Sequence, residues 1–270
     1  MGELIPQTTI VGMKRSAVWA FLFAGWFWSM TGTTLFAQSN EVSFDRPGVA
    51  DSPFLVPADG LQLEMGWASG FNKPVPGDFL PSVLLRIRVQ KSMELRWNGK
   101  YNPPLDILSD RLASDGMVLW SAGGKWYLFE QRGLRPETAI IANGFIGSGR
   151  SESTKREWGL DGYFALMNTI SPRLSVNTNV GYLQFRNLGV PFLGTSCSVN
   201  WGLDEAIDCF IEGFAWRSSN GDHLEVGWDV GVTLFSRQGV QWDVSFLRSH
   251  IGGRDTESLN LGFSRRFMAR

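Results

Sequence analysis

Two short stretches decide the fold of this chain: residues 83–89, Val-Leu-Leu-Arg-Ile-Arg-Val, and residues 93–97, Met-Glu-Leu-Arg-Trp. If the turn between them centres on Lys91, two charged pairs share one face, Arg88 with Glu94 and Arg86 with Arg96. The apolar pairs then share the other face: Val89 with Met93, Ile87 with Leu95, and Leu85 with Trp97. A single register separates charged from apolar side chains, as cross-strand pairing requires. The sequence therefore predicts a β-hairpin with one apolar face.

The same alternation continues along the chain. Apolar residues occupy the odd positions of 61–67, and large apolar residues alternate with polar residues or Gly over 224–232. Further strands are predicted near 117–128, 136–147, 157–169, 173–185, 193–202, 205–217, 223–235, 239–248 and 257–267. A tilted strand needs roughly 9–11 residues to cross a bilayer, whereas the commonest soluble strand has about 5–6. About twelve strands of the longer kind are predicted.

The predicted connections sort by length. Long connections fall at 72–80, 101–115, 148–156, 186–192, 218–222 and 249–256, and short ones near 90–92, 129–135, 170–172, 203–204 and 236–238. Bacterial outer-membrane barrels have short periplasmic turns and longer outer loops. Composition, with 12 Trp, 19 Phe and 31 Gly, also suits a soluble β-sandwich or barrel. Loop sorting favours an all-β, antiparallel up-and-down transmembrane β-barrel over residues 60–267.

The N-terminal residues have the order of a secretory signal. Lys14 and Arg15 precede an apolar run over 17–30, and a polar stretch ends at Ala37. This order predicts a signal peptide, 1–37, that is cleaved on export to the outer membrane, with Met13 as an alternative start to Met1. A membrane anchor is the alternative, but the run falls short of the roughly 20 residues that a helical span needs. Residues 38–59 follow as a periplasmic tail or as a segment inside the barrel.

Charged and polar side chains gather on the predicted inward face. The predicted lumen-lining residues are Glu64, Arg86, Arg88, Glu94, Arg96, Lys125, Asp161, Glu212, Glu225, Asp229, Asp243 and Arg266. They either line an open or gated path or form ion pairs that fill the lumen. The densest group, three arginines around Glu94, could select anions or form an interior ionic ladder.

The remaining reactive side chains are few. Cys197 and Cys209 face each other if their hairpin turns at Leu203, and exported proteins favour disulfides, but their neighbours suggest a lipid-facing side. Two Cys and two His that lie far apart in sequence predict no metal site and no cofactor. His223 and His250 lie near serines in predicted outer loops, so a barrel hydrolase is a minor alternative. The expectation is that the protein is not an enzyme.

Several motifs resemble one family. These are 45–48 (Asp-Arg-Pro-Gly), 51–53 (Asp-Ser-Pro), the Leu-Arg and Glu-Leu-Arg stretches of the 83–97 hairpin, 124–126 (Gly-Lys-Trp) and 136–142. Their order, over about residues 43–267, resembles the family labelled "MetA-pathway of phenol degradation", a group of outer-membrane transporters. The resemblance implies a barrel and transport of hydrophobic or aromatic compounds. It carries no catalytic residues.

The sequence thus favours an outer-membrane channel or transporter for small solutes, hydrophobic or aromatic among them. A structural or adhesive barrel is the alternative, although the short predicted outer loops argue against adhesion. Expected partners are outer-membrane lipid, the barrel assembly machinery and a small solute. Balanced charge, with 25 basic and 26 acidic residues, gives no reason to expect nucleic acid. The last predicted strand ends at Phe267, although barrels of this kind commonly end on the aromatic residue itself, and here three residues follow.

Overall fold

The computed structural model describes residues 44–46, 48–58, 60–71, 79–102, 117–149, 158–186, 189–236 and 239–268. Contacts divide the chain into the units Met1–Ser39 and Asn40–Arg270, and every described residue belongs to the second unit. The predicted signal peptide lies outside the described residues. Among the described residues, no helix has the length and apolar character needed to cross a membrane.

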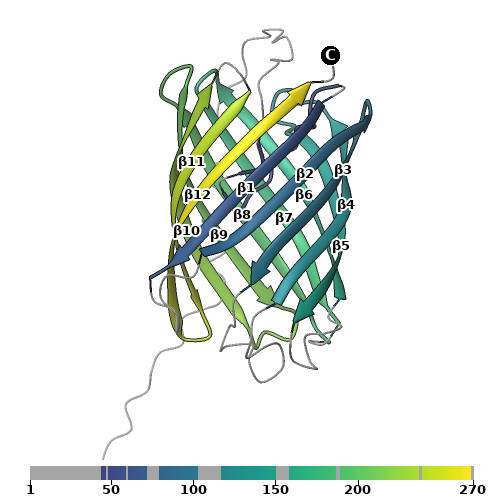
Figure 1. The fold of residues 1–270 in the computed structure, drawn as a ribbon, viewed down its shortest axis with the longest axis vertical. Helices are drawn as coiled ribbons and strands as arrows, with labels where there is room; N and C mark the ends of the chain where they lie inside the picture. The colour runs from purple at the N-terminus through teal and green to yellow at the C-terminus, as the bar shows by residue number, and fades with distance from the viewer. Residues whose placement is uncertain are drawn as a thin grey trace, which may run out of the picture. The chain divides into compact units, whose positions relative to one another are not determined.

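Twelve antiparallel strands close into one barrel (Figure 1). They are β1 (Gly60–Gly70), β2 (Phe79–Gln90), β3 (Met93–Asn102), β4 (Met117–Phe129), β5 (Glu137–Gly149), β6 (Trp158–Ser171), β7 (Leu174–Phe185), β8 (Pro191–Gly202), β9 (Ile207–Ser218), β10 (Leu224–Ser236), β11 (Val240–Ile251) and β12 (Arg254–Met268). Each strand pairs with the next along the chain, and β1 pairs with β12 to close the ring. The predicted all-β barrel of about twelve strands is confirmed.

The register of the β2–β3 hairpin agrees with the sequence at four of five pairs. Arg88 pairs with Glu94, Arg86 with Arg96, Ile87 with Leu95, and Leu85 with Trp97. The predicted pair of Val89 with Met93 is wrong, because an irregularity after Arg88 brings Gln90 opposite Met93. A bulge of this kind leaves one residue of the longer strand without a partner.

The connections define two ends of the barrel. The turn end holds connections 91–92, 130–136, 172–173, 203–206 and 237–239, with the start of β1 and the end of β12. The loop end holds 71–78, 103–116, 150–157, 186–190, 219–223 and 252–253. The prediction of a long loop over residues 249–256 is wrong. The strands continue to a two-residue turn of Gly252 (φ 57°) and Gly253 (φ 80°), and positive φ at both positions matches the turn that joins twisted strands most tightly.

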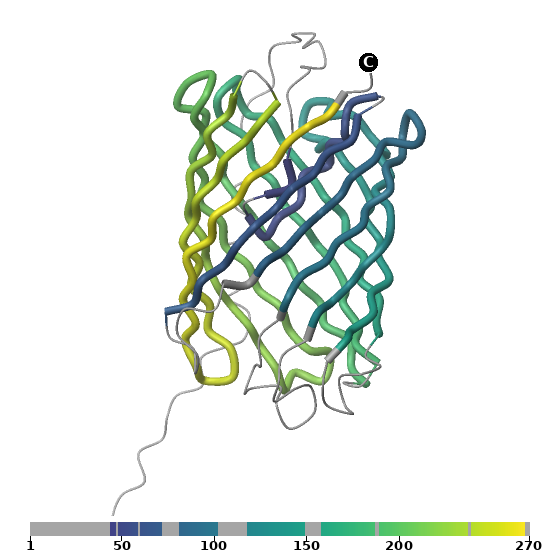
Figure 2. The backbone as a smooth tube through the Cα atoms, in the orientation of Figure 1, coloured from purple at the N-terminus to yellow at the C-terminus, as the bar shows by residue number. Residues whose placement is uncertain are grey.

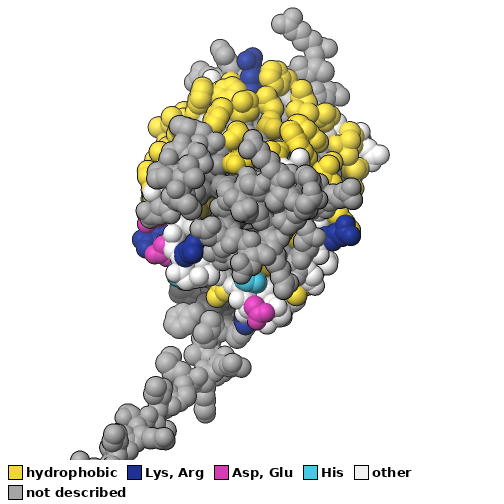
Figure 3. Space-filling model, turned by 60° about the horizontal axis from the view of Figure 1, so that its bottom comes forward, with side chains coloured by type: hydrophobic (Ala, Val, Ile, Leu, Met, Phe, Trp, Pro, Cys, Tyr) yellow, Lys and Arg dark blue, Asp and Glu magenta, His cyan; other side chains and the backbone are white. Residues whose placement is uncertain are grey.

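The barrel wall is apolar outside and polar inside. On β9, Ile211 is 58% exposed while its neighbour Glu212 is 2% exposed, and on β10, Val230 and Asp229 show the same contrast. Hydrophobic side chains cover the visible part of the wall in Figure 3, and charged side chains gather toward the loop end. Aromatic side chains stack along this surface, as Trp97 does on Trp120 with 5.0 Å between ring centroids. Transmembrane barrels have this inside-out arrangement.

The described residues that precede β1 lie inside the barrel. Figure 2 shows this stretch, in purple, within the ring of strands. We call the described residues 44–46 and 48–58 the luminal segment. Its hydrogen bonds reach Glu64 of β1, Glu94 of β3, Asn179 of β7 and Glu212 of β9, so it contacts several sides of the lumen. Of the two placements that the sequence left open for residues 38–59, the described part occupies the lumen.

Candidate functional site

A network of ion pairs joins β1, β2, β3 and β4 inside the barrel. Arg86 of β2 is fully buried; its Nε lies 2.8 Å from Glu94 Oε1, and its Nη1 lies 3.1 Å from Glu64 Oε1. Lys125 of β4 is also fully buried and lies 3.8 Å from the same oxygen of Glu94. The alternating pattern of each strand aims these side chains inward, so long ionic side chains from four strands meet.

Asp45 of the luminal segment sits at the centre of this network. Its Oδ2 lies 2.8 Å from Lys125 Nζ and 3.3 Å from Arg86 Nη1, and it also pairs with Arg96. Burial favours the neutral carboxyl, but Arg86, Lys125 and Arg96 outweigh burial and hold the pKa of Asp45 well below its usual range. Asp45 is therefore an ionised carboxylate that anchors the luminal segment to three strands.

Asp51 makes the second anchor. Its Oδ1 lies 3.3 Å from Arg96 Nη2, and its Oδ2 accepts a hydrogen bond from Tyr163 of β6. Its backbone N–H donates to Asn179 Oδ1 at 2.7 Å, and its carbonyl accepts from Asn177 and Asn179 of β7. Burial raises the pKa of Asp51 to about 7, with Arg96 opposing that rise and Asp45 adding to it. This carboxyl therefore titrates near neutral pH.

Backbone groups of the luminal segment are satisfied by the wall. Lys125 Nζ donates to the carbonyl of Ser52 at 2.8 Å, and Arg86 Nη2 donates to the carbonyl of Phe54 at 2.8 Å. The Val56 amide donates to Glu94 Oε2 at 2.8 Å, and Val56 itself is fully buried. Irregular backbone at membrane depth needs such partners within the protein.

The charged side chains on the inward face of β9, β10 and β11 are acidic. Glu212 accepts the Val49 amide at 2.7 Å, and Asp229 is its directly paired neighbour on β10. Arg46 of the luminal segment places Nη2 3.5 Å from Asp243 Oδ1, and Gln241 donates to the Arg46 carbonyl at 3.3 Å. The Arg46 guanidinium lies against Gly66 of β1, where any side chain would occupy the same space.

The other predicted lumen residues lie on the same inward side of their strands. Arg88 Nη1 donates to the Val56 carbonyl at 3.3 Å, and Asn143 donates to Asp161 at 2.7 Å. Glu225 and Arg266 each alternate with outward apolar neighbours that are about half exposed, Leu224 at 49% and Phe267 at 40%. The structure thus gathers five predicted residues around Asp45, namely Glu64, Arg86, Glu94, Arg96 and Lys125.

Sequence reasoning missed an apolar group on the lumen side near the loop end. Phe145 of β5 and Leu119 of β4 are 6% and 8% exposed, and Leu183 and Phe185 of β7 pack against them. The rings of Phe145 and Phe185 meet edge to face with 5.0 Å between centroids. Their inward placement depends only on strand parity, so the alternation over 136–147 and 173–185 could have indicated them.

The disulfide that the sequence allowed between Cys197 and Cys209 is not present. Cys197 and Cys209 are both free thiols, because Cys197 pairs with Gly213 and Cys209 pairs with Trp201. The β8–β9 connection spans residues 203–206 instead of turning at Leu203, and this shifts the register. Cys197 is exposed on the outward face.

The two histidines lie near the loop end. His250 Nδ1 lies 2.8 Å from Asp255 Oδ1 on the outward face. Ser249, its neighbour in β11, is buried on the inward face and contacts Thr256, because adjacent residues of a strand point to opposite sides. His223 stacks on Phe192 at 6.4 Å between ring centroids. Neither arrangement aligns a serine with an imidazole and a carboxylate.

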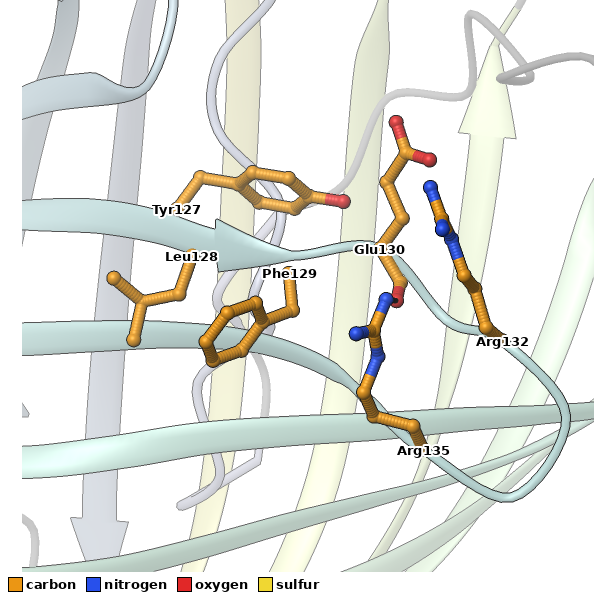
Figure 4. A pocket seen from close by; sticks show the side chains of 6 residues that line it. All are labelled: Tyr127, Leu128, Phe129, Glu130, Arg132 and Arg135. Carbon is orange, nitrogen blue, oxygen red and sulfur yellow. Dashed lines mark hydrogen bonds between the residues drawn. The ribbon is translucent and has the colours of Figure 1, made fainter.

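One pocket of about 360 Å³ lies at the turn end, beside the β4–β5 connection (Figure 4). Its lining includes Tyr127, Phe129 and Arg135, and the Arg135 guanidinium lies 5.4 Å from the centre of the Phe129 ring. Tyr127 donates to Glu137 at 2.6 Å. The pocket is a feature of this turn and shares no residue with the ion-pair network.

Several solved structures share the fold. An outer membrane channel from Pseudomonas putida F1 matches with a TM-score of 0.57 and 11% identity, covering 82% of this chain and 99% of that one. The KdgM porin in complex with disordered oligogalacturonate matches with a TM-score of 0.50 and 11% identity, covering 77% and 99%. LpxR from Salmonella typhimurium matches with a TM-score of 0.50 and 10% identity, and the match covers 76% of this chain and 99% of that one. At such identities the likeness shows the fold alone.

No curated protein sequence matches the chain. A family model does match, over residues 44–267, which includes the luminal segment and nearly all of the barrel. This match confirms the resemblance seen in the motifs at 45–53 and in the β2–β3 hairpin. The chain therefore belongs to the family described as "Putative MetA-pathway of phenol degradation".

Proposed function

We propose that the protein is an outer-membrane channel for small solutes and that the luminal segment is its plug. The observation that carries this proposal is a lumen occupied by a segment that is not part of the wall. Barrels of about eight strands can be filled by their own side chains, whereas twelve strands enclose a wider lumen. Here the luminal segment occupies the lumen and is held chiefly through hydrogen bonds and ion pairs. Such polar contacts can exchange for water when the segment moves.

The chemistry of the lumen supports small apolar or aromatic solutes as the cargo. Phe145, Phe185, Leu119 and Leu183 offer an apolar surface near the loop end, where a solute from outside would enter. The family description refers to phenol degradation, and one similar structure is described as an outer membrane channel. The proposal includes export through a cleaved signal peptide, insertion by the barrel assembly machinery and contact with outer-membrane lipid.

A structural or adhesive barrel without transport is the alternative. Two of the outer connections, 219–223 and 252–253, are short and offer little surface to a partner, although 103–116 is longer. A hydrolase is disfavoured because Ser249 and His250 point to opposite faces of β11. We therefore propose that the protein has no enzymatic role.

Planar-bilayer recording tests the channel. The chain is expressed in full in a Gram-negative host, purified from the outer membrane and checked for heat-modifiable gel migration as evidence of folding. Discrete conductance steps from folded protein are the expected result. Folded protein that never conducts would favour the structural barrel.

Uptake into liposomes tests the cargo. Vesicles that contain the wild type should admit phenol faster than vesicles that contain Phe145→Ser, because the substitution removes an aromatic ring from the proposed entry surface. Gly159, which is paired with Phe145, has no side chain and contacts this ring, so that position contributes no atoms to fill the space that the substitution leaves. Leu193→Ser, on the outward face at 60% exposure, is the matched control. Equal phenol uptake by all three proteins would mean that the apolar surface around Phe145 does not assist phenol entry.

A further inference from the structure

Opposite walls of the lumen carry opposite charge. The inward side chains of β2, β3 and β4 include five bases and one acid: Arg86, Arg88, Arg96, Lys100, Lys125 and Glu94. Those of β9, β10 and β11 include Glu212, Glu225, Asp229 and Asp243, with no inward base among their described residues. In the closed order, five strands separate β3 from β9 in either direction, so the two walls face each other.

The luminal segment neutralises these walls unequally. Asp45 and Asp51 both face the basic wall, where Glu64 and Glu94 supply two further carboxylates. Among the described residues of the segment, the acidic wall receives one base, Arg46, whose Nη2 lies 3.5 Å from Asp243. Within the described ranges, ion pairs reach Arg86, Arg96 and Lys125 on the basic wall, whereas on the acidic wall the one ion pair is that of Asp243 with Arg46. Glu225 lies within electrostatic range of Lys100 from the opposite wall, and Glu212 and Asp229 form no ion pair with a described base.

The acidic wall also holds buried polar atoms without partners. Glu212 Oε1, Asp229 Oδ1 and Thr233 Oγ1 have no hydrogen-bond partner among the described residues, and these three residues are 2%, 1% and 6% exposed. Glu212 and Asp229 are paired directly across β9 and β10, and Thr233 is paired with Asp243 across β10 and β11. A buried carboxylate oxygen without a partner is unfavourable until a cation or a donor approaches it.

We propose that Glu212, Asp229, Asp243 and Thr233 form a cation-attracting wall and that the channel passes cations in preference to anions. Arg46 already shows that a guanidinium is accommodated at this wall. No group of three or more His, Cys, Asp or Glu side chains within the described ranges has the geometry to hold a metal ion. Carboxylates that line a channel favour mobile cations, so the expected species are alkali or ammonium-type cations. This inference rests on the proposed channel function.

The measurement is the reversal potential of the purified full protein in a bilayer with a tenfold KCl gradient. The wild type is expected to favour K⁺. The double variant Glu212→Gln/Asp229→Asn should lower the ratio of cation to anion permeability by roughly twofold or more, because two lumen charges are lost. Thr233→Lys should shift the preference toward Cl⁻ without removing either carboxylate. Asp204→Asn/Asp222→Asn, which removes two carboxylates from exposed connections, is the matched control and should keep the wild-type ratio.

The outcomes separate the inference from the proposed function. A conducting wild type that favours Cl⁻, or a folded double variant with an unchanged ratio, would overturn the cation-attracting wall and leave the channel standing. Folded wild type without any conductance would overturn both. If the double variant does not reach the folded, heat-modifiable state, Thr233→Lys and the wild-type preference decide the matter alone.

Discussion

Asp45 is shared by three bases from three neighbouring strands, Arg86 of β2, Arg96 of β3 and Lys125 of β4. Removing its charge in Asp45→Asn leaves buried cations uncompensated, and breaking a buried ion pair costs about 3–5 kcal/mol. We expect the luminal segment to leave its position more often and the mean single-channel conductance to rise. Asp222→Asn, in an exposed connection, should conduct as the wild type does. Identical conductance in all three proteins would mean that Asp45 does not hold a plug.

Asp51 makes the seating of the same segment depend on pH. Its pKa is raised to about 7, above an ordinary value of about 4, so between these values the seated segment binds a proton that a released segment has lost. Its contribution to seating is complete below about pH 4 and is lost as the pH rises through about 7. Asp45, whose pKa is lowered, contributes in the opposite sense and loses its contribution only in stronger acid.

The equilibrium between the seated and the released segment should therefore shift toward release by roughly a hundredfold between pH 5 and pH 8, and the open probability should rise with it. In Asp51→Asn this rise should be absent, because the amide does not titrate. Single-channel recording at several pH values measures both proteins, and Asp222→Asn controls for the general effect of losing a carboxylate. A variant that keeps the full wild-type pH dependence would assign it to other groups.

Among the strands, the β2–β3 register was predictable because one register places the charged pairs on the inward face and the apolar pairs on the outward face. Any one-residue slip would place Arg86 or Arg96 in the apolar face. The bulge at Val89 was not predictable, since 90–92 contains no Gly or Asn to fix a turn type. The strands themselves were found because alternation is a local signal.

The register of the β8–β9 hairpin could not be predicted from the local sequence pattern. Its four-residue turn places the Asp204 carboxylate as acceptor for the Ala206 amide at 2.7 Å, and this side-chain bond selects a turn centre that residue spacing alone does not. The luminal segment is a similar case. The contact of Lys125 with Asp45 spans 80 residues, and no periodicity encodes it. The predicted basic group was therefore visible in the sequence, but its acidic partners in the segment were not.

An engineered cross-link tests this register. In a protein with Cys209→Ser, the substitution Gly213→Cys should form a disulfide with Cys197, because directly paired residues have Cα atoms about 4.5–5.5 Å apart and disulfides need about 4.4–6.8 Å. Native Cys197 and Cys209 should not bond under the same oxidant. Non-reducing electrophoresis of the proteolysed chain reads both results. A bond between the native pair would restore the register centred on Leu203.

At the scale of the whole molecule, the described filling of the lumen is largely polar, whereas the outward surface is apolar. Hydrophobic burial into lipid then orients the wall, while hydrogen bonds and ion pairs organise the interior. Binary patterning predicted this inversion, since each strand alternates. Binary patterning could not predict whether the lumen is empty. The filling of the lumen depends on the luminal segment, which has no periodic pattern of apolar and polar residues.

Because the outward face contacts lipid, a lysine placed there should lower the free energy of unfolding by an amount that depends on its depth in the bilayer. Val230 lies at the middle of β10 and is 42% exposed on the outward face, whereas Leu224, 49% exposed on the same face, begins the strand at the loop end. Val230→Lys should lower the free energy of unfolding by about 2–4 kcal/mol and Leu224→Lys by about 0–1 kcal/mol, because lysine near the interface reaches water. Urea titration of the folded proteins in phospholipid vesicles measures both changes. Equal costs at the two positions would mean that the middle of β10 does not lie in the hydrocarbon core, and the barrel would then have a different position in the membrane.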